Sequence, residues 1–286
     1  MQQLIDLRAL EIFRTVANEG SVSKAASKLN RVQSNVSTRI KQLEEQLGKD
    51  LFFRKSRGLV LTPDGEMMLS YADRLISLSE EATEAINEGN PNGTLRIGAM
   101  ESTASARLPA VLSQFIDQHP GVEIALETGT TGALLEKLNN HELDAVFVAE
   151  PVSFKNLSTQ PVFKENLVIV APKTFPELDA IEEISGKTVI AFEDGCAYRR
   201  YIEEWLLESG IVPGRIMAVS SYLSILACVS AGMGFALVPQ SVLDLFAGER
   251  QFHFYSMPKK YHGIRTMLTW RSDYQSAKLE ALKAFL

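Results

Sequence analysis

The spacing of apolar residues in the first sixty positions constrains this chain more than any other feature. A first amphipathic helix, ending near residues 18–20, is predicted by apolar residues at helical spacing: Leu7, Leu10, Phe13, Val16 and Ala17. A short second helix over 22–29 follows Ser21, in which Ala25 and Ala26 are small enough for a neighbouring helix to approach closely. This pattern predicts a compact helical head.

A third helix is predicted over 33–47, after a tight turn at 30–32. Its apolar positions turn inward and leave a polar outer surface of Ser34, Asn35, Ser37, Thr38, Arg39 and Lys41. Short hydroxyl and amide side chains can enter a DNA major groove, and Arg39 and Lys41 can reach phosphates or a guanine edge. The composition is that of a recognition helix.

Residues 51–61 contain two short apolar strands around a basic turn, and Thr62–Gly65 opens another helix. This pattern predicts a wing from which Arg54, Lys55 and Arg57 project toward a minor groove or the flanking backbone. The candidate DNA contacts of the head are Ser21, Arg31, Gln33, Ser34, Asn35, Ser37, Thr38, Arg39, Lys41, Arg54, Lys55 and Arg57.

The charge of the chain is distributed unevenly. Residues 1–62 hold eleven Lys or Arg against six Asp or Glu, a balance of +5, which leaves −11 for the rest of a chain whose net charge is −6. A basic head on an acidic body fits phosphate binding at one end. On charge alone, a merely solvated basic surface remains the alternative.

Several motifs of the head resemble those of the LysR-type transcriptional regulators. They are Ala25-Ala-Ser-Lys-Leu29, Gln33-Ser-Asn-Val-Ser37, Ile40-Lys-Gln-Leu-Glu44 and the run from Leu47 to Thr62, with Gly65. The chain departs from the family at Val32, often Ser, and at Thr38, often Arg. The resemblance implies an N-terminal winged helix-turn-helix with a long linker helix, and a C-terminal α/β two-lobed domain like the periplasmic binding proteins. It also implies dimers that pair into tetramers.

A long helix is predicted over 64–87, because no Gly or Pro interrupts it after Gly65. Its apolar residues alternate spacings of three and four, as in a heptad seam: Met68, Tyr71, Leu75, Leu78, Ala82 and Ala85. With no partner expected in its own head, the seam is predicted to pair with a second chain, and Met68, Tyr71, Leu75, Leu78 and Ala82 are the candidate dimerisation residues. Packing on the body of the same chain is the alternative.

After a turn-rich linker at 90–93, strands alternate with helices, as in an α/β fold. Strands are predicted over 95–98, 122–128, 145–148, 167–171, 188–192, 217–219, 236–238 and 267–270, and helices over 104–118, 132–140, 199–209 and 222–231. The resemblance places the two crossings between lobes near 161–165 and 263–267. We therefore expect a DNA-binding domain over 1–62, a linker helix over 63–90 and a regulatory domain over 91–286, with lobe 1 at about 91–162 and 266–286 and lobe 2 at about 163–265.

Ligands of open α/β sheets bind beyond the carboxyl ends of the strands, where helices begin. Three such segments follow strands or precede helices, around 101–103, 128–131 and 194–199. With Phe147, which resembles a family segment near the cleft, the candidate effector contacts are Glu101, Ser102, Thr103, Thr130, Thr131, Cys196, Tyr198 and Arg199. Ser102 and Thr103 would serve equally as helix caps, and Arg199 would serve equally as a partner of Glu203. Tyr198 and Arg199 favour an anionic metabolite, whereas Glu101 opposes one.

Cys196 opens a second interpretation, since a thiol at a helix N-terminus beside Arg199 is expected to have a lowered pKa and to react with oxidants. Cys228 lies in an apolar helix and lacks the short spacing of the family's peroxide sensors. Redox sensing is therefore the minor alternative to small-molecule sensing.

Enzymatic activity is not expected, because no Walker A, dinucleotide or nucleophile-elbow motif is present and the four histidines lack metal-ligand spacing. We expect no metal and no cofactor. A solute-binding protein would match the body alone, but the absence of an export signal and the winged head oppose that function. The expected molecule is a cytoplasmic regulator, not inserted in a membrane, whose partners are double-stranded DNA, a small-molecule effector, further copies of itself and RNA polymerase.

Reversing the charge of Arg54 and Arg57 to Glu is expected to weaken binding to every DNA sequence and to flatten its salt dependence, because binding then releases fewer counterions from the phosphates. Gel-shift titrations at several salt concentrations measure both effects. Unaltered binding would remove the wing from the interface.

Overall fold

The computed structural model describes residues 4–55, 58–86, 91–175, 184–246 and 252–286. The chain forms two compact units: Met1–Gly89 with Asn140–Glu142, and Asn90–Asn139 with Leu143–Leu286. Each unit has its own hydrophobic core.

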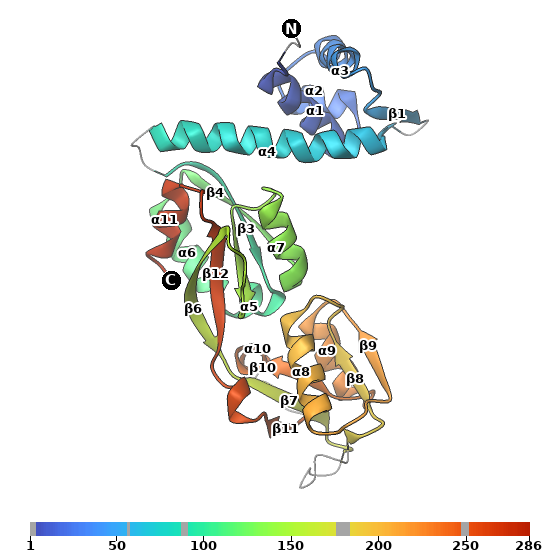
Figure 1. The fold of residues 1–286 in the computed structure, drawn as a ribbon, viewed down its shortest axis with the longest axis vertical. Helices are drawn as coiled ribbons and strands as arrows, with labels where there is room; N and C mark the ends of the chain where they lie inside the picture. The colour runs from blue at the N-terminus through green and yellow to red at the C-terminus, as the bar shows by residue number, and fades with distance from the viewer. Residues whose placement is uncertain (1–3, 56–57, 87–90, 176–183, 247–251) are drawn as a thin grey trace. The chain divides into compact units, whose positions relative to one another are not determined.

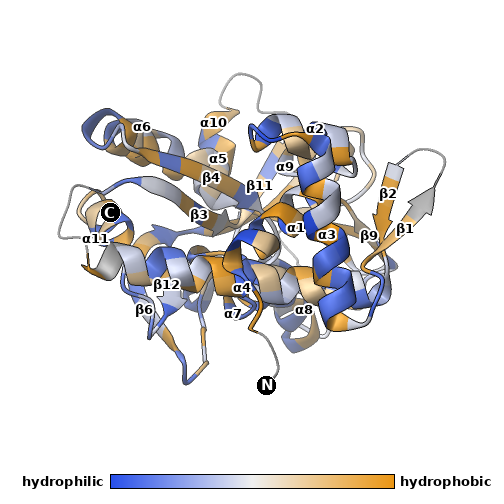
Figure 2. Cartoon of the chain, turned by 90° about the horizontal axis from the view of Figure 1, so that it is seen from above, coloured by the Kyte–Doolittle hydropathy of each residue, from blue (hydrophilic) through white to orange (hydrophobic). Residues whose placement is uncertain are grey.

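Three helices build the head: α1 (Leu7–Glu19), α2 (Val22–Lys28) and α3 (Gln33–Leu47). Asp6 and Ser21 cap α1 and α2 by accepting backbone N–H groups, and Gly20 ends α1 in the left-handed conformation. Phe13, Ala25, Val36 and Leu43 are buried in the shared core. In Figure 2 the ribbon of α3 carries both hydrophilic and hydrophobic colours, as expected for an amphipathic helix.

The wing is an antiparallel pair of β1 (Phe52–Lys55) and β2 (Gly58–Leu61), with Phe52 opposite Leu61. Its second strand rests on the end of α1, because the N–H of Leu59 donates to the carbonyl of Gly20 over 2.9 Å. A Cβ atom at Gly58, whose φ is +132°, would lie 2.7 Å from that carbonyl oxygen. Glycine at 58 is therefore what allows the wing to approach α1 this closely.

Helix α4 (Pro63–Ile86) is a single uninterrupted helix (Figure 1). The Thr62 hydroxyl starts it by accepting the N–H of Gly65 over 2.9 Å. The expectation that this helix has no partner within its own head is wrong, because Ala72 and Ile76 are buried in the head core, where α4 contacts α1. Met68 packs partly against the same core. Another face of the helix remains exposed: the exposed fraction is 51% for Tyr71, 42% for Leu75 and 56% for Leu78.

Lobe 1 of the second unit is built on a mixed sheet in the order β4-β3-β5-β12-β6. The strands are β3 (Gly93–Ala99), β4 (Val122–Thr128), β5 (Ala145–Ala149), β6 (Leu157–Glu165) and β12 (Ile264–Arg271). Strands β3, β4 and β5 are parallel, and β12 returns antiparallel between β5 and β6. Three helices, α6 (Leu108–Gln118), α7 (Thr131–Asn139) and α11 (Ala277–Lys283), bury their apolar sides in the two cores of this lobe.

Lobe 2 contains β7 (Leu167–Pro172), β8 (Thr188–Ala191), β9 (Arg215–Ala218), β10 (Ala236–Pro239) and β11 (Phe252–Ser256). Strand β7 lies between β10 and β11, and β8 pairs with β9. An isolated bridge from Val189 to Phe235 joins the two groups of strands. The helices are α8 (Ala197–Glu208), α9 (Tyr222–Ser230), α10 (Gln240–Leu245) and the short η2 (Lys259–Tyr261).

The sequence pattern missed several elements of the body. The helix predicted over 104–118 is two helices, α5 (Glu101–Ala106) and α6, because Pro109 starts a new first turn after Arg107. Strand β6 was not predicted; it contains Pro161, which an edge strand tolerates, and the ladder shifts register there between Thr266 and Met267. Strand β11 and helices α10 and α11 were also missed. The chain passes between lobes after Glu165 and before Ile264, where β6 ends and β12 begins.

Candidate functional site

The outer face of α3 is polar and accessible. Val36, Ile40 and Leu43 hold the helix in the head core, and every candidate contact on it is exposed: Gln33, Ser34, Asn35, Ser37, Thr38, Arg39 and Lys41. Lys41 pairs with Glu45 at 3.5 Å, one turn along the helix. The burial of three apolar residues thus turns a continuous polar surface outward.

The beginning of α3 is held by a side-chain contact to α2 and lacks a side-chain cap. The Gln33 Nε2 donates to Ser23 Oγ of α2 over 3.0 Å, so the exposed amide of Gln33 is oriented by the preceding helix. Val32 occupies the N-cap position and has no side-chain oxygen to accept the first N–H groups of α3. The side chain of the candidate Ser21 caps α2 by accepting the N–H of Lys24. The candidate Arg31 is exposed in the turn between α2 and α3.

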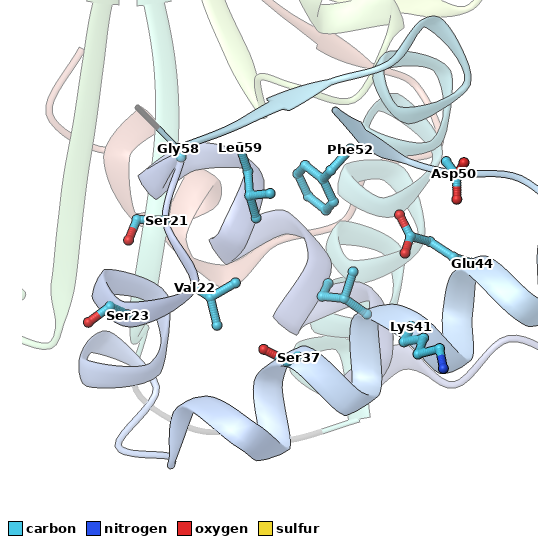
Figure 3. A pocket seen from close by; sticks show the side chains of 12 residues that line it. Ser21, Val22, Ser23, Ser37, Lys41, Glu44, Asp50, Phe52, Gly58 and Leu59 are labelled. Atoms are coloured by element: carbon cyan, nitrogen blue, oxygen red, sulfur yellow. The ribbon is translucent and has the colours of Figure 1, made fainter. Parts of the chain in front are cut away.

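A hollow of about 620 Å³ separates α2 and α3 from the wing. Figure 3 shows Val22, Phe52 and Leu59 directed into it, with Ser37 and Lys41 on the α3 side. Glu44 fixes this side of the wing, because its Oε1 accepts the backbone N–H of Leu51 over 2.8 Å. The hollow is therefore a concavity beside the polar face of α3. Of the candidate wing contacts, Arg57 and the side chains of Arg54 and Lys55 lie outside the described residues.

A second candidate site lies between the lobes of the other unit. A small cavity, about 20 Å³, is lined from lobe 1 by Met100, Glu101, Ser102, Gly129, Thr130 and Thr131, and from lobe 2 by Phe192, Cys196, Tyr198 and Tyr222. These residues follow β3, β4 and β8 or begin α9, so the cavity lies beyond strand ends, as expected for an open α/β sheet. Its size admits about one water molecule.

The lobes make a direct contact beside the cavity. The N–H of Gly132, at the start of α7, donates to the carbonyl of Gly195 in lobe 2 over 3.2 Å. Gly195 has φ of +89°, and a Cβ atom there would lie 3.2 Å from Thr130 Oγ1. Glycine at 195 therefore permits both the backbone conformation and the closeness of the lobes.

The crossing between lobes contains a buried carboxylate. Glu165 is 2% exposed and accepts Arg107 Nε of lobe 1 and Ser241 Oγ of lobe 2, each over 2.7 Å. The neighbouring Asn166 accepts the N–H of Gln240 through its carbonyl and that of Gly263 through its side chain. The hydrogen bonds of Glu165 and Asn166 thus connect the two lobes to each other and the first crossing to the second.

Several polar atoms of the cavity wall lack a hydrogen-bond partner. Among the described residues, Glu101 Oε2, Thr131 Oγ1 and the Tyr198 hydroxyl are buried and make no hydrogen bond of normal geometry. Burial raises the pKa of Glu101, against a lowering by the backbone N–H of Tyr222. Burial also raises the pKa of Tyr198, which the neighbouring Ser102 hydroxyl partly opposes. An unpaired polar group in a closed site costs free energy that a ligand or a water molecule can recover.

The structure brings together six of the nine candidate effector residues and separates three. Phe147 is fully buried in the lobe 1 core, where it stacks on Phe163. Thr103 is buried behind the cavity wall and does not line it. Arg199 also lies outside the lining, because its guanidinium pairs with Asp194 at 2.8 Å and with Glu203 at 2.9 Å. The alternative partner foreseen for Arg199, Glu203, is observed, and Asp194 is a second partner.

The expected acidity of Cys196 is wrong. Burial is the largest influence and raises the pKa of its thiol, although the N–H groups of Arg199 and Tyr198 and the charge of Arg199 act in the opposite direction. Cys196 and Cys228 are both free thiols. The thiolate, which is the form that reacts with oxidants, is therefore disfavoured at this helix start.

Four lining residues were not among the candidates: Met100, Gly129, Phe192 and Tyr222. Met100, Gly129 and Phe192 directly follow β3, β4 and β8, so the rule that ligands bind beyond strand ends would have found them. Tyr222 is buried at the start of α9 and had no sequence signal of its own.

Membrane spans and metal clusters are both absent from the described ranges. None of the helices there is long and apolar enough to cross a bilayer. Within the same ranges, no group of three His, Cys, Asp or Glu side chains is arranged to hold a metal ion.

Comparison with known proteins agrees with this architecture. Residues 7–66 match the family model of bacterial regulatory helix-turn-helix proteins, lysR family, and residues 88–286 match that of the LysR substrate binding domain. The chain is 36% identical over 283 residues to the HTH-type transcriptional regulator GltR of Bacillus subtilis, covering 99% of this chain and 95% of that protein. It is 37% identical over 284 residues to the regulator CzcR of Bacillus thuringiensis, covering 99% and 96%.

Solved structures show the same fold. A full-length, singly substituted OxyR from Pseudomonas aeruginosa superposes with a TM-score of 0.73 at 23% identity, covering 99% of this chain and 94% of that one. CbnR, a LysR family transcriptional regulator, in complex with its target DNA, superposes with a TM-score of 0.69 at 19% identity, covering 98% of each chain. The predicted fold class, a winged helical head with a long linker helix and a two-lobed α/β body, is confirmed.

The raised pKa of Cys196 predicts slow alkylation by iodoacetamide at neutral pH in a Cys228→Ser variant. Because only the thiolate reacts, the rate should rise as the pH passes through the raised pKa of the folded protein, above the midpoint measured in urea. The midpoint of the pH profile reports the pKa of the thiol. Poor access of the reagent to the thiol would lower the maximum rate but would not move the midpoint. A folded midpoint at or below the unfolded one would restore the redox interpretation.

Proposed function

Because this chain belongs to the LysR family of DNA-binding transcriptional regulators, we propose that α3 reads its operator through the exposed polar face and that a small molecule between the lobes controls the outcome. The observation that carries the first part is the combination of buried Val36, Ile40 and Leu43 with a fully exposed polar face. Its relatives GltR and CzcR are named transcriptional regulators.

The proposed contacts divide into two groups by chemistry. Gln33, Ser34, Ser37 and Thr38 carry short amide or hydroxyl groups suited to base edges, whereas Arg31, Arg39 and Lys41 carry cations suited to phosphates. The Ser23 hydroxyl supports a base-reading role for Gln33. It accepts one N–H of the amide and leaves the other N–H and the carbonyl oxygen for the two-point pairing that a glutamine makes with adenine. We propose that Arg54, Lys55 and Arg57 contact the flanking backbone.

We also propose that α4 pairs with the same helix of a second chain, which would present two recognition helices to a two-fold operator. The exposed apolar row of Tyr71, Leu75 and Leu78 supports this arrangement, and Ala82 continues it. Met68 is better explained by the head core. Pairing of dimers into tetramers and contact with RNA polymerase complete the proposal.

The effector is proposed to act through lobe closure. Lining groups come from both lobes, so a ligand that contacts both favours one degree of closure over another. Such a shift would change how the heads are presented to DNA, and with it DNA bending or polymerase contact.

Gln33→Ala should weaken binding to a duplex selected by the wild-type chain from a random pool by roughly 1–3 kcal/mol, or about 5- to 150-fold, because a two-point base contact is lost. Arg39→Ala should instead weaken binding to selected and unrelated duplexes alike and reduce the salt slope by about 1. Fluorescence anisotropy titrations measure both.

Gln46→Ala, an exposed truncation at the other end of α3, serves as the control and should bind as the wild type does. Equal losses on selected and unrelated DNA for Gln33→Ala would contradict its base-reading role.

The double variant Leu75→Glu, Leu78→Glu should sediment as a smaller species than the wild type, because four like charges would meet across a two-fold seam. Sedimentation velocity measures the oligomeric state. Thr83→Glu adds a charge to an exposed position off the seam of the same helix and should leave the state of the wild type unchanged. A double variant that sediments like the wild type would exclude α4 as the interface.

A further inference from the structure

The chemistry of the cavity between the lobes identifies the kind of ligand it takes. This inference rests on the proposed function of the cavity as the effector site. The wall contains residues from four segments that begin helices α5, α7, α8 and α9, and these segments supply both hydrogen-bond donors and acceptors. A ligand must supply the hydrogen-bonding groups that complement the donors and acceptors still without a partner in the wall.

The helix starts at the cavity differ in what they offer to an anion, and the backbone donors of α7 are occupied. At the start of α7, the N–H of Gly132 donates to Gly195 and that of Ala133 lies 3.4 Å from Thr130 Oγ1. At the start of α8, the N–H groups of Tyr198 and Arg199 lower the pKa of the Cys196 thiol. At the start of α5, which no side chain caps, the Glu101 carboxylate lies in the first turn and would repel an anion.

The open side-chain positions include acceptors. The backbone N–H of Tyr222 lowers the pKa of Glu101, and Glu101 Oε2 is buried without a partner in the described structure. The Thr131 hydroxyl is likewise buried and unpaired there, and the Tyr198 hydroxyl, on a residue only 3% exposed, lies beside the Ser102 hydroxyl. A hydroxyl can accept or donate a hydrogen bond, but an ionised carboxylate only accepts.

The charges of the wall agree with this assignment. Among the described residues that line the cavity, Glu101 is the only acidic side chain and none is Lys, Arg or His. Arg199, the nearest candidate for binding an anion, is held by Asp194 and Glu203. Phe192, Tyr198 and Tyr222 add aromatic rings, whose faces attract cations.

We propose that the effector carries a protonated amine, which donates to Glu101 Oε2 and to the Thr131 or Tyr198 hydroxyl. A carboxylate ligand placed there would meet a buried carboxylate with no cation to offset it. Only about one water molecule fits in the cavity, so an organic amine enters after the Gly132–Gly195 hydrogen bond breaks. The bound ligand then keeps the two lobes further apart than they are in this structure.

Thermal unfolding of the full chain, with sets of compounds that share a carbon skeleton and differ only in charge, tests the assignment. Each set contains an amine, an alcohol and a carboxylate, as in benzylamine, benzyl alcohol and benzoate, and in the diamine, diol and dicarboxylate of butane. A saturable rise in the unfolding temperature is expected with an amine and not with its carboxylate counterpart. A rise with carboxylates alone, or no rise with any amine, would overturn the proposal.

Glu101→Gln tests the carboxylate itself, since it keeps the shape and a hydrogen-bonding oxygen but removes the charge. Affinity for the stabilising amine should fall at least about tenfold, as for the loss of a charged hydrogen bond. Glu136→Gln, an exposed carboxylate on α7, is the matched control and should bind the amine as the wild type does. Equal affinity in Glu101→Gln and wild type would contradict the role of Glu101.

The same variants separate this inference from the proposed function. DNA binding of Glu101→Gln without any compound should equal that of the wild type, because the head is unchanged. Failure of the wild type to bind DNA would contradict the proposed function, whereas failure of amines to bind would contradict only the ligand assignment.

Discussion

The buried carboxylate of Glu165 is the contact on which the two-lobed body depends. It lies where the chain first leaves lobe 1, and it accepts hydrogen bonds from Arg107 of that lobe and Ser241 of the other. A carboxylate at 2% exposure is tolerated only if it is paired, and removing one partner of such a pair typically costs about 3–5 kcal/mol. Asn166 joins the second crossing to the same point. The position of each lobe at the cavity follows from this junction.

In the cavity between the lobes, the hydrogen-bonding groups that have no partner within the protein determine which ligands fit. Helix starts at such clefts usually offer N–H groups to anions, but here Gly195 and Thr130 occupy those of α7, and the first turn of α5 carries Glu101. The unpaired side-chain groups of the wall include a carboxylate oxygen and the Thr131 hydroxyl, with the Tyr198 hydroxyl nearby. The sign of the ligand charge is thus decided by internal contacts of the wall rather than by the helices that surround it.

Local patterns predicted the head well and the candidate effector site only in part. The helical spacing of 7–17 and 33–47 was correct because each helix buries a continuous apolar side in one small core. Phe147 was misplaced because β5 is buried on both faces, so neither alternation nor flanking residues indicates which side chains face a cleft. Arg199 was wrongly assigned to the ligand because its guanidinium pairs with Glu203, one helical turn away. The loop before α8 brings a second carboxylate, that of Asp194, to the same guanidinium.

By itself the sequence determined the class of the molecule: helical periodicity, a basic wing and an acidic α/β body are properties of neighbouring residues, and local physics is enough to recognise them. Only the tertiary structure decided which groups share the cavity, since Glu101, Thr131 and Tyr198 are far apart in the chain and meet where two lobes close. It also decided the state of Cys196, whose pKa is raised because burial outweighs the N–H groups and the charge that its place at a helix start provides. Burial and partner choice are set by the whole fold, and both the acidity of a group and its availability to a ligand depend on them.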